Sequence, residues 1–160
     1  MSKKTNYWTQ YVDWVKAKIY PYVESIFKDL SAPDWLQGIV MFLIKLGIYL
    51  NIVIMPFAIA AVFMLAGTNI LALVAVVLYA FAAYGFYTNL DAMLNAKPEG
   101  WDTLFALTIL SGVVSLLTSN LYSVQGWVAT IANLFLSLLL LWIVRPRFGL
   151  GAKSKKQEAK

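Results

Sequence analysis

Long apolar stretches separated by short polar breaks make up most of this chain. Four stretches approach the roughly 20 apolar residues that cross the hydrocarbon core of a bilayer; they cover residues 46–66, 70–90, 102–122 and 126–144. Uninterrupted apolar runs of this length are typical of membrane-spanning helices. The pattern therefore predicts an all-α integral membrane protein whose four spans lie within residues 35–144.

Turn signals between these stretches predict how the spans pair. Gly67-Thr68-Asn69 joins the first stretch to the second, and Ser123 to Gly126 joins the third to the fourth. Connections this short make antiparallel neighbours. A longer polar link, residues 91–100, separates the two pairs. We therefore expect a four-helix bundle of two antiparallel hairpins.

Residues 1–34 form an arm of a different kind. From Thr5 to Leu30, polar and apolar residues alternate at helical spacing, and Pro21 is expected to kink the helix or to start a second one. Charges are spread throughout the arm, which argues against a cleaved signal peptide. The predicted apolar stripe consists of Tyr7, Tyr11, Trp14, Val15, Ile19, Tyr22, Val23, Ile26 and Leu30. This amphipathic arm is expected to lie on the cytoplasmic surface of the membrane; the alternative is that the same face docks a partner protein.

The distribution of basic residues predicts the orientation. The chain has 13 Lys and Arg, and they lie in residues 1–45, at Lys97 and in residues 145–160, with none in the two short turns. The positive-inside rule then places both termini and the middle link in the cytoplasm, which requires an even number of spans. Residues 145–160 are predicted to be a disordered basic tail that attracts anionic lipids at the cytoplasmic face of the cell membrane. Because topology already accounts for the charge, nucleic-acid binding is not expected.

Composition supports the membrane assignment and excludes several kinds of chemistry. Hydrophobic residues make up 61% and charged residues 13% of the chain, against about 45–50% and 25% in soluble domains. Without Cys or His, the chain cannot form disulfides, thiol nucleophiles, His-ligated haem or a Ser-His-Asp triad. We therefore expect neither an enzyme nor a protein with a metal or another cofactor.

Neutral polar residues are the candidate functional positions inside the predicted spans. No ionisable residue lies at mid-span, so proton-coupled transport has no evident carrier. Ser111 and Ser115 recur at four-residue spacing on the third span, as Asn133 and Ser137 do on the fourth. Such ridges either pack helix against helix or line a polar path for a solute.

A second candidate lies on the first span. Pro56 frees the carbonyl of Ile52, next to Asn51, so this span is expected to kink where polar groups need partners. A neighbouring helix commonly satisfies such groups, but broken helices also form the binding sites of transporters.

Residues expected at the lipid interface combine amphipathic aromatic rings with long basic side chains. They are Tyr7, Tyr11, Trp14, Trp35, Lys45, Trp101, Trp127, Trp142, Arg145 and Arg147.

The last third of the chain resembles small four-span bacterial membrane proteins. The resemblance rests on Lys97-Pro98-Glu99-Gly100-Trp101, the Ser-rich span that follows, and the last span ending in Arg145-Pro146-Arg147. It implies a bacterial cytoplasmic membrane. No activity is attached to it, so it implies no functional residues.

Together these patterns predict a non-catalytic component that organises the membrane or assists a partner membrane protein. The alternative is a small homo-oligomeric transporter or pore, indicated by Asn51, Pro56 and the Ser and Asn ridges.

Overall fold

The structure is a computed structural model that describes residues 6–67, 70–120 and 123–150. The described part is all-α, which confirms the predicted fold class. Its helices are α1 (Tyr7–Lys18), α2 (Tyr20–Phe27), α3 (Asp34–Ala66), α4 (Ile70–Thr88), α5 (Leu90–Leu94), α6 (Pro98–Ser115) and α7 (Val124–Val144), with a π-helical turn η1 (Leu116–Asn120) and a 3₁₀ turn η2 (Arg145–Phe148).

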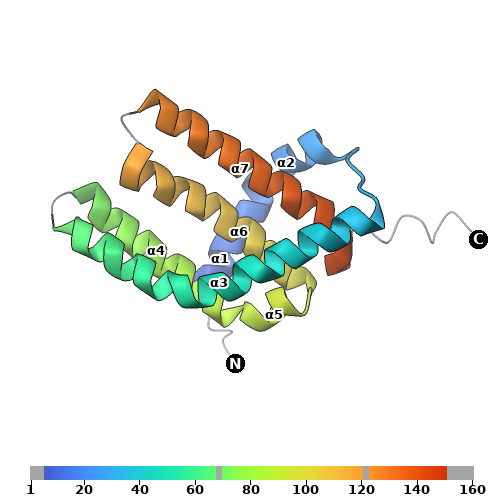
Figure 1. Ribbon diagram of the computed structural model, residues 1–160, viewed down its shortest axis with the longest axis horizontal. Coiled ribbons are helices and arrows are strands. Elements are labelled where there is room, and N and C mark those ends of the chain that lie inside the picture. Colours follow the sequence, from blue (N-terminus) through green and yellow to red (C-terminus); the bar gives the residue numbers. More distant parts are fainter. Residues whose placement is uncertain (1–5, 68–69, 121–122, 151–160) are drawn as a thin grey trace, which may run out of the picture.

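Four helices of the described chain are long and apolar enough to cross a membrane. The segments are Asp34–Met64, Ile70–Thr88, Pro98–Thr118 and Val124–Phe148. In Figure 1, α3 runs beside α4 and α6 runs beside α7, and α4 packs against α6. The spans therefore form the predicted bundle of two antiparallel hairpins. We call the end that carries Lys97, Arg145 and Arg147 the basic end, and the opposite one the far end.

The helix boundaries follow local capping signals. Helix α6 begins at Pro98, before residue 102, where the apolar stretch of the third span begins. Proline is favoured in the first turn of a helix, because the N–H that it lacks would have no intrahelical acceptor there. Helix α3 begins with Asp34 in its first turn and continues for 33 residues, roughly 50 Å at 1.5 Å per residue. This length exceeds the hydrocarbon core, which is about 30 Å thick.

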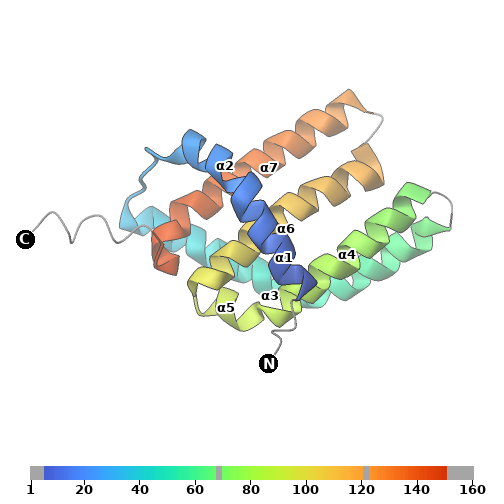
Figure 2. The ribbon, with the colours of Figure 1, turned by 180° about the vertical axis from the view of Figure 1, so that it is seen from behind.

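The N-terminal arm is two helices that pack on the bundle (Figure 2). Helix α1 crosses α6 and α4, and α2 contacts α7. The break follows Lys18, where Pro21 lies in the first turn of α2. Two polar contacts attach α1 to α6: the Tyr11 hydroxyl donates to the Ala106 carbonyl at 2.9 Å, and Lys16 Nζ lies 2.7 Å from Asp102 Oδ2. The inner face of the arm therefore docks on its own chain.

A glycine makes room for the arm. A Cβ atom at Gly85 of α4 would lie 2.2 Å from the ring of Trp8, which is itself buried. Burial beside Ala106 also raises the pKa of the Tyr11 hydroxyl to about 12. The outer face of the arm keeps Tyr7, Trp14 and Tyr22 exposed. The predicted apolar stripe is thus divided between the bundle and the surroundings.

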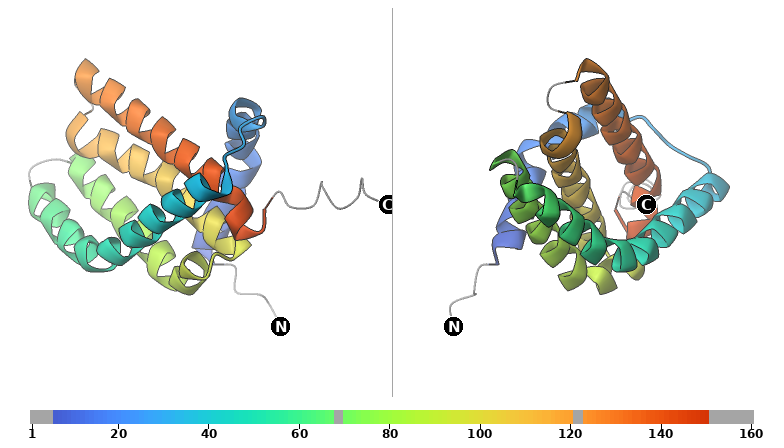
Figure 3. Two further views of the ribbon diagram at one scale, coloured as in Figure 1. Left: turned by 45° about the vertical axis from the view of Figure 1, so that its right-hand side comes forward. Right: turned by 60° about the vertical axis from the view of Figure 1, so that its left-hand side comes forward.

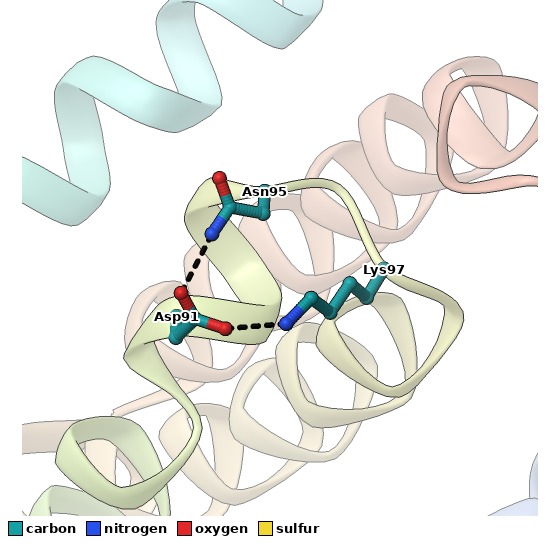
Figure 4. A network of polar contacts seen from close by, with 3 residues as sticks. All are labelled: Asp91, Asn95 and Lys97. Atoms are coloured by element: carbon teal, nitrogen blue, oxygen red, sulfur yellow. Dashed lines mark hydrogen bonds and ion pairs between the residues drawn. The ribbon is translucent and has the colours of Figure 1, made fainter.

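The link between the hairpins contains the short helix α5, close against α6. Asp91 accepts hydrogen bonds from Asn95 at 2.6 Å and from Lys97 at 2.5 Å (Figure 4). The hydrogen bond and the positive charge of Lys97 hold the pKa of the Asp91 carboxyl below its usual value, and Asp91 likewise raises the pKa of Lys97. Gly100 is required here, because a Cβ atom would lie 2.2 Å from the Ala92 carbonyl oxygen.

Aromatic side chains fill the basic end of the bundle. The Trp101 ring stacks on Phe105 with centroids 5.3 Å apart, and its indole N–H donates to the Leu141 carbonyl at 2.9 Å. Trp142 of α7 and Val40 of α3 belong to the same buried cluster. We call this cluster the aromatic plug.

Candidate functional site: a polar groove within the bundle

A cavity of about 550 Å³ lies within the four apolar helices. Its lining comes from α3, α4, α6, η1 and α7. In the right-hand view of Figure 3, α3 runs at an angle to α6 and α7. Asn51 on α3 and Asn133 on α7 both line the cavity and remain exposed. The cavity is therefore a groove that opens on the surface of the bundle between α3 and α7.

The structure brings together most of the polar positions predicted from the sequence. Asn51, Ser111, Ser115, Asn133 and Ser137 all line the groove. Nothing in the sequence alone indicates that the first span faces the third and fourth at Asn51. These spans share the groove because α3 crosses the bundle at an angle to α6 and α7 (Figure 3).

Three of these side chains lie at similar distances along their own helices. The lining starts at the basic end with Ile44, Leu104 and Leu141. At 1.5 Å per residue from these positions, Asn51 lies about 10 Å along α3, Ser111 about 10 Å along α6 and Asn133 about 12 Å along α7. Farther along α6 and α7, the hydroxyls of Ser115 and Thr130 approach to 3.4 Å. We call Asn51, Ser111 and Asn133 the polar level.

The polar level has unused hydrogen-bonding capacity. Asn51 Nδ2 donates to the Gly47 carbonyl of its own helix at 2.9 Å, which leaves its side-chain oxygen without a partner among the described residues. Within the same described ranges, the Asn133 amide and the Ser111 hydroxyl make no side-chain hydrogen bond. Nearer the basic end, by contrast, Thr108 is satisfied by the Leu104 carbonyl at 2.9 Å.

The groove is blind at the basic end. Beyond Ile44 and Leu141, the space between α3, α6 and α7 is filled by the aromatic plug, in which Trp101 is only 1% exposed. The plug therefore separates the polar level from the surface that carries Arg145 and Arg147.

Pro56 lies outside this groove. It interrupts the hydrogen bonding of α3 as expected, and the Ile52 carbonyl that it frees accepts a hydrogen bond from the Tyr87 hydroxyl of α4 at 2.9 Å. The sequence did not identify Tyr87 as this partner, because nothing in its spacing tells which helix packs beside Pro56.

The residues predicted for the lipid interface divide into three groups. Tyr7, Trp14, Trp35 and Trp127 are exposed, as are most large apolar side chains along the outer face of α3. Lys45 is half-buried on the same helix. Tyr11, which belongs to the arm, is half-buried against α6, and both Trp101 and Trp142 are buried in the aromatic plug. Their amphipathic rings satisfy interior packing and hydrogen bonding, so these two tryptophans do not face the bilayer.

Two arginines end the last span. The Arg145 guanidinium lies 4.6 Å from the centroid of the Trp142 ring and 5.6 Å from that of Tyr20, within the range of cation–π attraction. Burial raises the pKa of the Tyr20 hydroxyl, and the charge of Arg145 opposes that rise. Arg147 Nη2 donates to the Asp34 carbonyl at 2.9 Å and so connects α7 to the start of α3.

The groove is suited to neutral hydrogen bonding. Its lining contains no Asp, Glu, Lys or Arg among the described residues, so it offers no acid–base pair. The described part of the chain also contains no group of three acidic, His or Cys residues that could hold a metal ion. The chain matches no protein-family model, no curated protein and no solved structure.

Proposed function

We propose that this chain is a non-catalytic, multi-pass membrane protein that binds a membrane constituent in its groove. The observation that carries the proposal is the polar level, where Asn51, Ser111 and Asn133 from three helices line one open cavity. In hydrocarbon an unpaired amide or hydroxyl is costly. A bound group that pairs with these side chains is therefore favoured over bare lipid tails.

Binding accounts for the geometry better than conduction does. A pore must open at both ends, whereas the aromatic plug fills the basic end of the groove with buried Trp101, Phe105 and Trp142. The lining also supports a binding role over a catalytic one, because general acid–base catalysis mostly uses His, carboxylates or Lys, and Tyr79 is the one titratable side chain among the described lining residues.

The remaining surfaces support a role in organising the membrane around this groove. We place both termini in the cytoplasm, from the charge distribution, and the basic end at the cytoplasmic surface. There Arg145 and Arg147 attract anionic headgroups, and Tyr7 and Trp14 on the outer face of the arm enter the interface.

Transport is the second candidate function. The length of the groove supports it, since the lining on α6 and η1 runs from Leu104 to Thr118, roughly 21 Å of helix. In this case a solute enters at the polar level and leaves when the aromatic plug moves, in a chain that associates with further copies. Solute flux into liposomes that contain the purified protein would distinguish transport from binding alone.

Photolabelling of the full-length protein in nanodiscs tests the binding function. Four hexadecyl probes, each with a diazirine in the chain and a different headgroup, are titrated, and labelling of α6 and α7 is mapped by mass spectrometry. We expect at least one probe to label groove residues saturably, because a site has finite capacity whereas bulk lipid contact rises linearly.

The control uses matched substitutions on one helix. Ser111→Phe places a ring in the groove, whereas Val113→Phe places it on an exposed part of α6 outside the lining. Saturable labelling should disappear in Ser111→Phe and persist in Val113→Phe. Linear labelling with every probe, or equal labelling of the two variants, would exclude a binding function for the groove.

A further inference from the structure

The charge of the groove restricts what can bind there. Its lining combines apolar side chains with hydroxyls and amides and includes no formal charge among the described residues. An ion placed in such a cavity loses its hydration and gains no counter-ion, which is strongly unfavourable at low dielectric. A neutral ligand does not incur this cost.

The order of the lining residues indicates a ligand with two parts. Between the aromatic plug and the polar level, the walls are mostly apolar, with Ile44, Ile48 and Leu140 beside Ser137 and beside Thr108, whose hydroxyl donates to a carbonyl of its own helix. At the polar level, Asn133 offers both a donor and an acceptor, Ser111 offers a hydroxyl, and Asn51 offers an acceptor. The groove thus matches a molecule with an apolar segment next to a group that both donates and accepts hydrogen bonds.

The volume of the groove suits a small amphiphile. Its 550 Å³ lies within the range of about 300–1,000 Å³ that is typical of small-molecule sites.

We infer that the groove binds a neutral amphiphile whose hydroxyl or carboxamide group pairs with Asn51, Ser111 and Asn133 and whose apolar chain lies along the apolar walls of the groove. This inference rests on the proposed binding function and adds the chemical class of the ligand. It requires no covalent step and no movement of the plug.

A comparison of headgroups on one chain length tests the inference. The probes are hexadecanol, hexadecanamide, hexadecyl sulfate and hexadecyltrimethylammonium, each with a diazirine in the chain, and all are titrated into nanodiscs of the full-length protein. We expect the alcohol and the amide to half-saturate groove labelling at concentrations at least about tenfold lower than the two charged probes, because each hydrogen bond at the polar level adds affinity.

Substitution of Asn133 tests whether the polar level binds the headgroup. Asn133→Leu keeps the approximate size of the side chain and removes its hydrogen bonds, and should raise the half-saturating concentration of the alcohol about tenfold. Asn95→Leu is the same change outside the groove, on the exposed link, and should leave the value unchanged. Thermal unfolding followed by circular dichroism verifies that both variants fold.

The possible failures are distinct. If groove labelling is saturable but independent of headgroup, or if a charged probe binds more tightly, the neutral ligand is excluded while binding by the groove stands. Unchanged affinity of Asn133→Leu also excludes the neutral ligand. Labelling that stays linear for every probe removes the proposed function itself. A second polypeptide crosslinked along the groove, with the probes excluded, assigns the site to a partner helix and overturns the inference.

Discussion

The two halves of the bundle are built from the same helices but differ in how closely those helices meet. At the basic end, Trp101 and Phe105 of α6 and Trp142 of α7 fill the space between the spans and are buried. Toward the far end, the same two helices carry Ser111 and Asn133, which leave the groove open. Side-chain size along α6 and α7 therefore decides where the interior is filled.

The comparison also shows what small polar residues do in this bundle. Ser115 and Thr130 bring α6 and α7 together through their hydroxyls, 3.4 Å apart. Ser111 and Ser137 line the groove. The polar ridges of α6 and α7 thus do both things that the sequence left as alternatives. They pack against each other at Ser115 and Thr130, and they line the cavity that separates part of them from α3.

The largest expected loss of stability comes from removing a buried side chain at the basic end, which is the closed half of the bundle. Trp101→Ala removes a side chain that is 1% exposed and the indole N–H that donates to Leu141. Truncation of a buried Trp costs about 3–5 kcal/mol. Unfolding in mixed micelles, measured by steric trapping, should show this loss. Trp35→Ala, at a residue that is 68% exposed, should change stability by less than about 0.5 kcal/mol; equal losses would mean that the plug is not the stable part of the bundle.

A smaller effect is expected where the arm meets the bundle. Gly85→Ala puts a methyl group 2.2 Å from the Trp8 ring, so the arm must shift at a cost of about 1–3 kcal/mol. Trypsin should then cut after Lys16 and Lys18 more rapidly. Gly47→Ala is the matched control, because a Cβ atom there has nothing within 4 Å, and it should stabilise α3 by up to about 1 kcal/mol. Cleavage at the same rate in both variants would show that Trp8 does not hold the arm.

Tyr11 should make arm docking sensitive to alkaline pH. Its pKa is raised to about 12 from 10.0 by burial, so the docked state favours the neutral hydroxyl. The contribution of Tyr11 is therefore complete below pH 10 and is lost as pH rises through about 12. Spin labels on cysteines introduced at Ala17 and Glu99 should report separation of the arm over this range.

Tyr11→Phe is the control for this titration. It removes the hydrogen bond to Ala106, worth about 1 kcal/mol, and also removes the ionisable group. The variant should dock more weakly at neutral pH but lose the alkaline transition. A transition that persists in Tyr11→Phe would assign it to a different group.

Much of the fold could be predicted because hydropathy acts over whole helices. The four spans, their pairing into two hairpins and the break near Pro21 all follow from runs of residues and local turn signals. Such features depend on neighbours in the sequence, so a single sequence is enough to identify them.

The contacts of individual side chains were harder to predict from the sequence. The sequence assigned Trp101 and Trp142 to the lipid interface, since each lies at the edge of an apolar run, yet both face inward because Gly100 and the arm bring other elements over them. Similarly, Trp8 was not placed on the apolar stripe of the arm, although it is buried beside Gly85. Sequence spacing gives the faces of a helix, but the packing of neighbouring helices decides which face is inside.

The smallest effect is expected at the exposed network of the link, which sharpens the contrast with the buried plug beside it. Lys97 and Asp91 lie 2.5 Å apart, but their side chains are 51% and 73% exposed, so water and salt screen the pair. The pKa of Asp91 is lowered and that of Lys97 is raised. The stabilisation by this pair is therefore present between the ordinary pKa values of the two groups, 3.8 and 10.5. It is lost as pH falls through the lowered pKa of Asp91 or rises through the raised pKa of Lys97.

In the same steric-trapping measurement at neutral pH, the free energy of unfolding of Asp91→Asn should lie within experimental error of that of the unaltered chain. Asp102→Asn, at a side chain that is 19% exposed and paired with Lys16 of the arm, should destabilise more. The reverse order would mean that the link, and not the docked arm, contributes the electrostatic stability of the closed half.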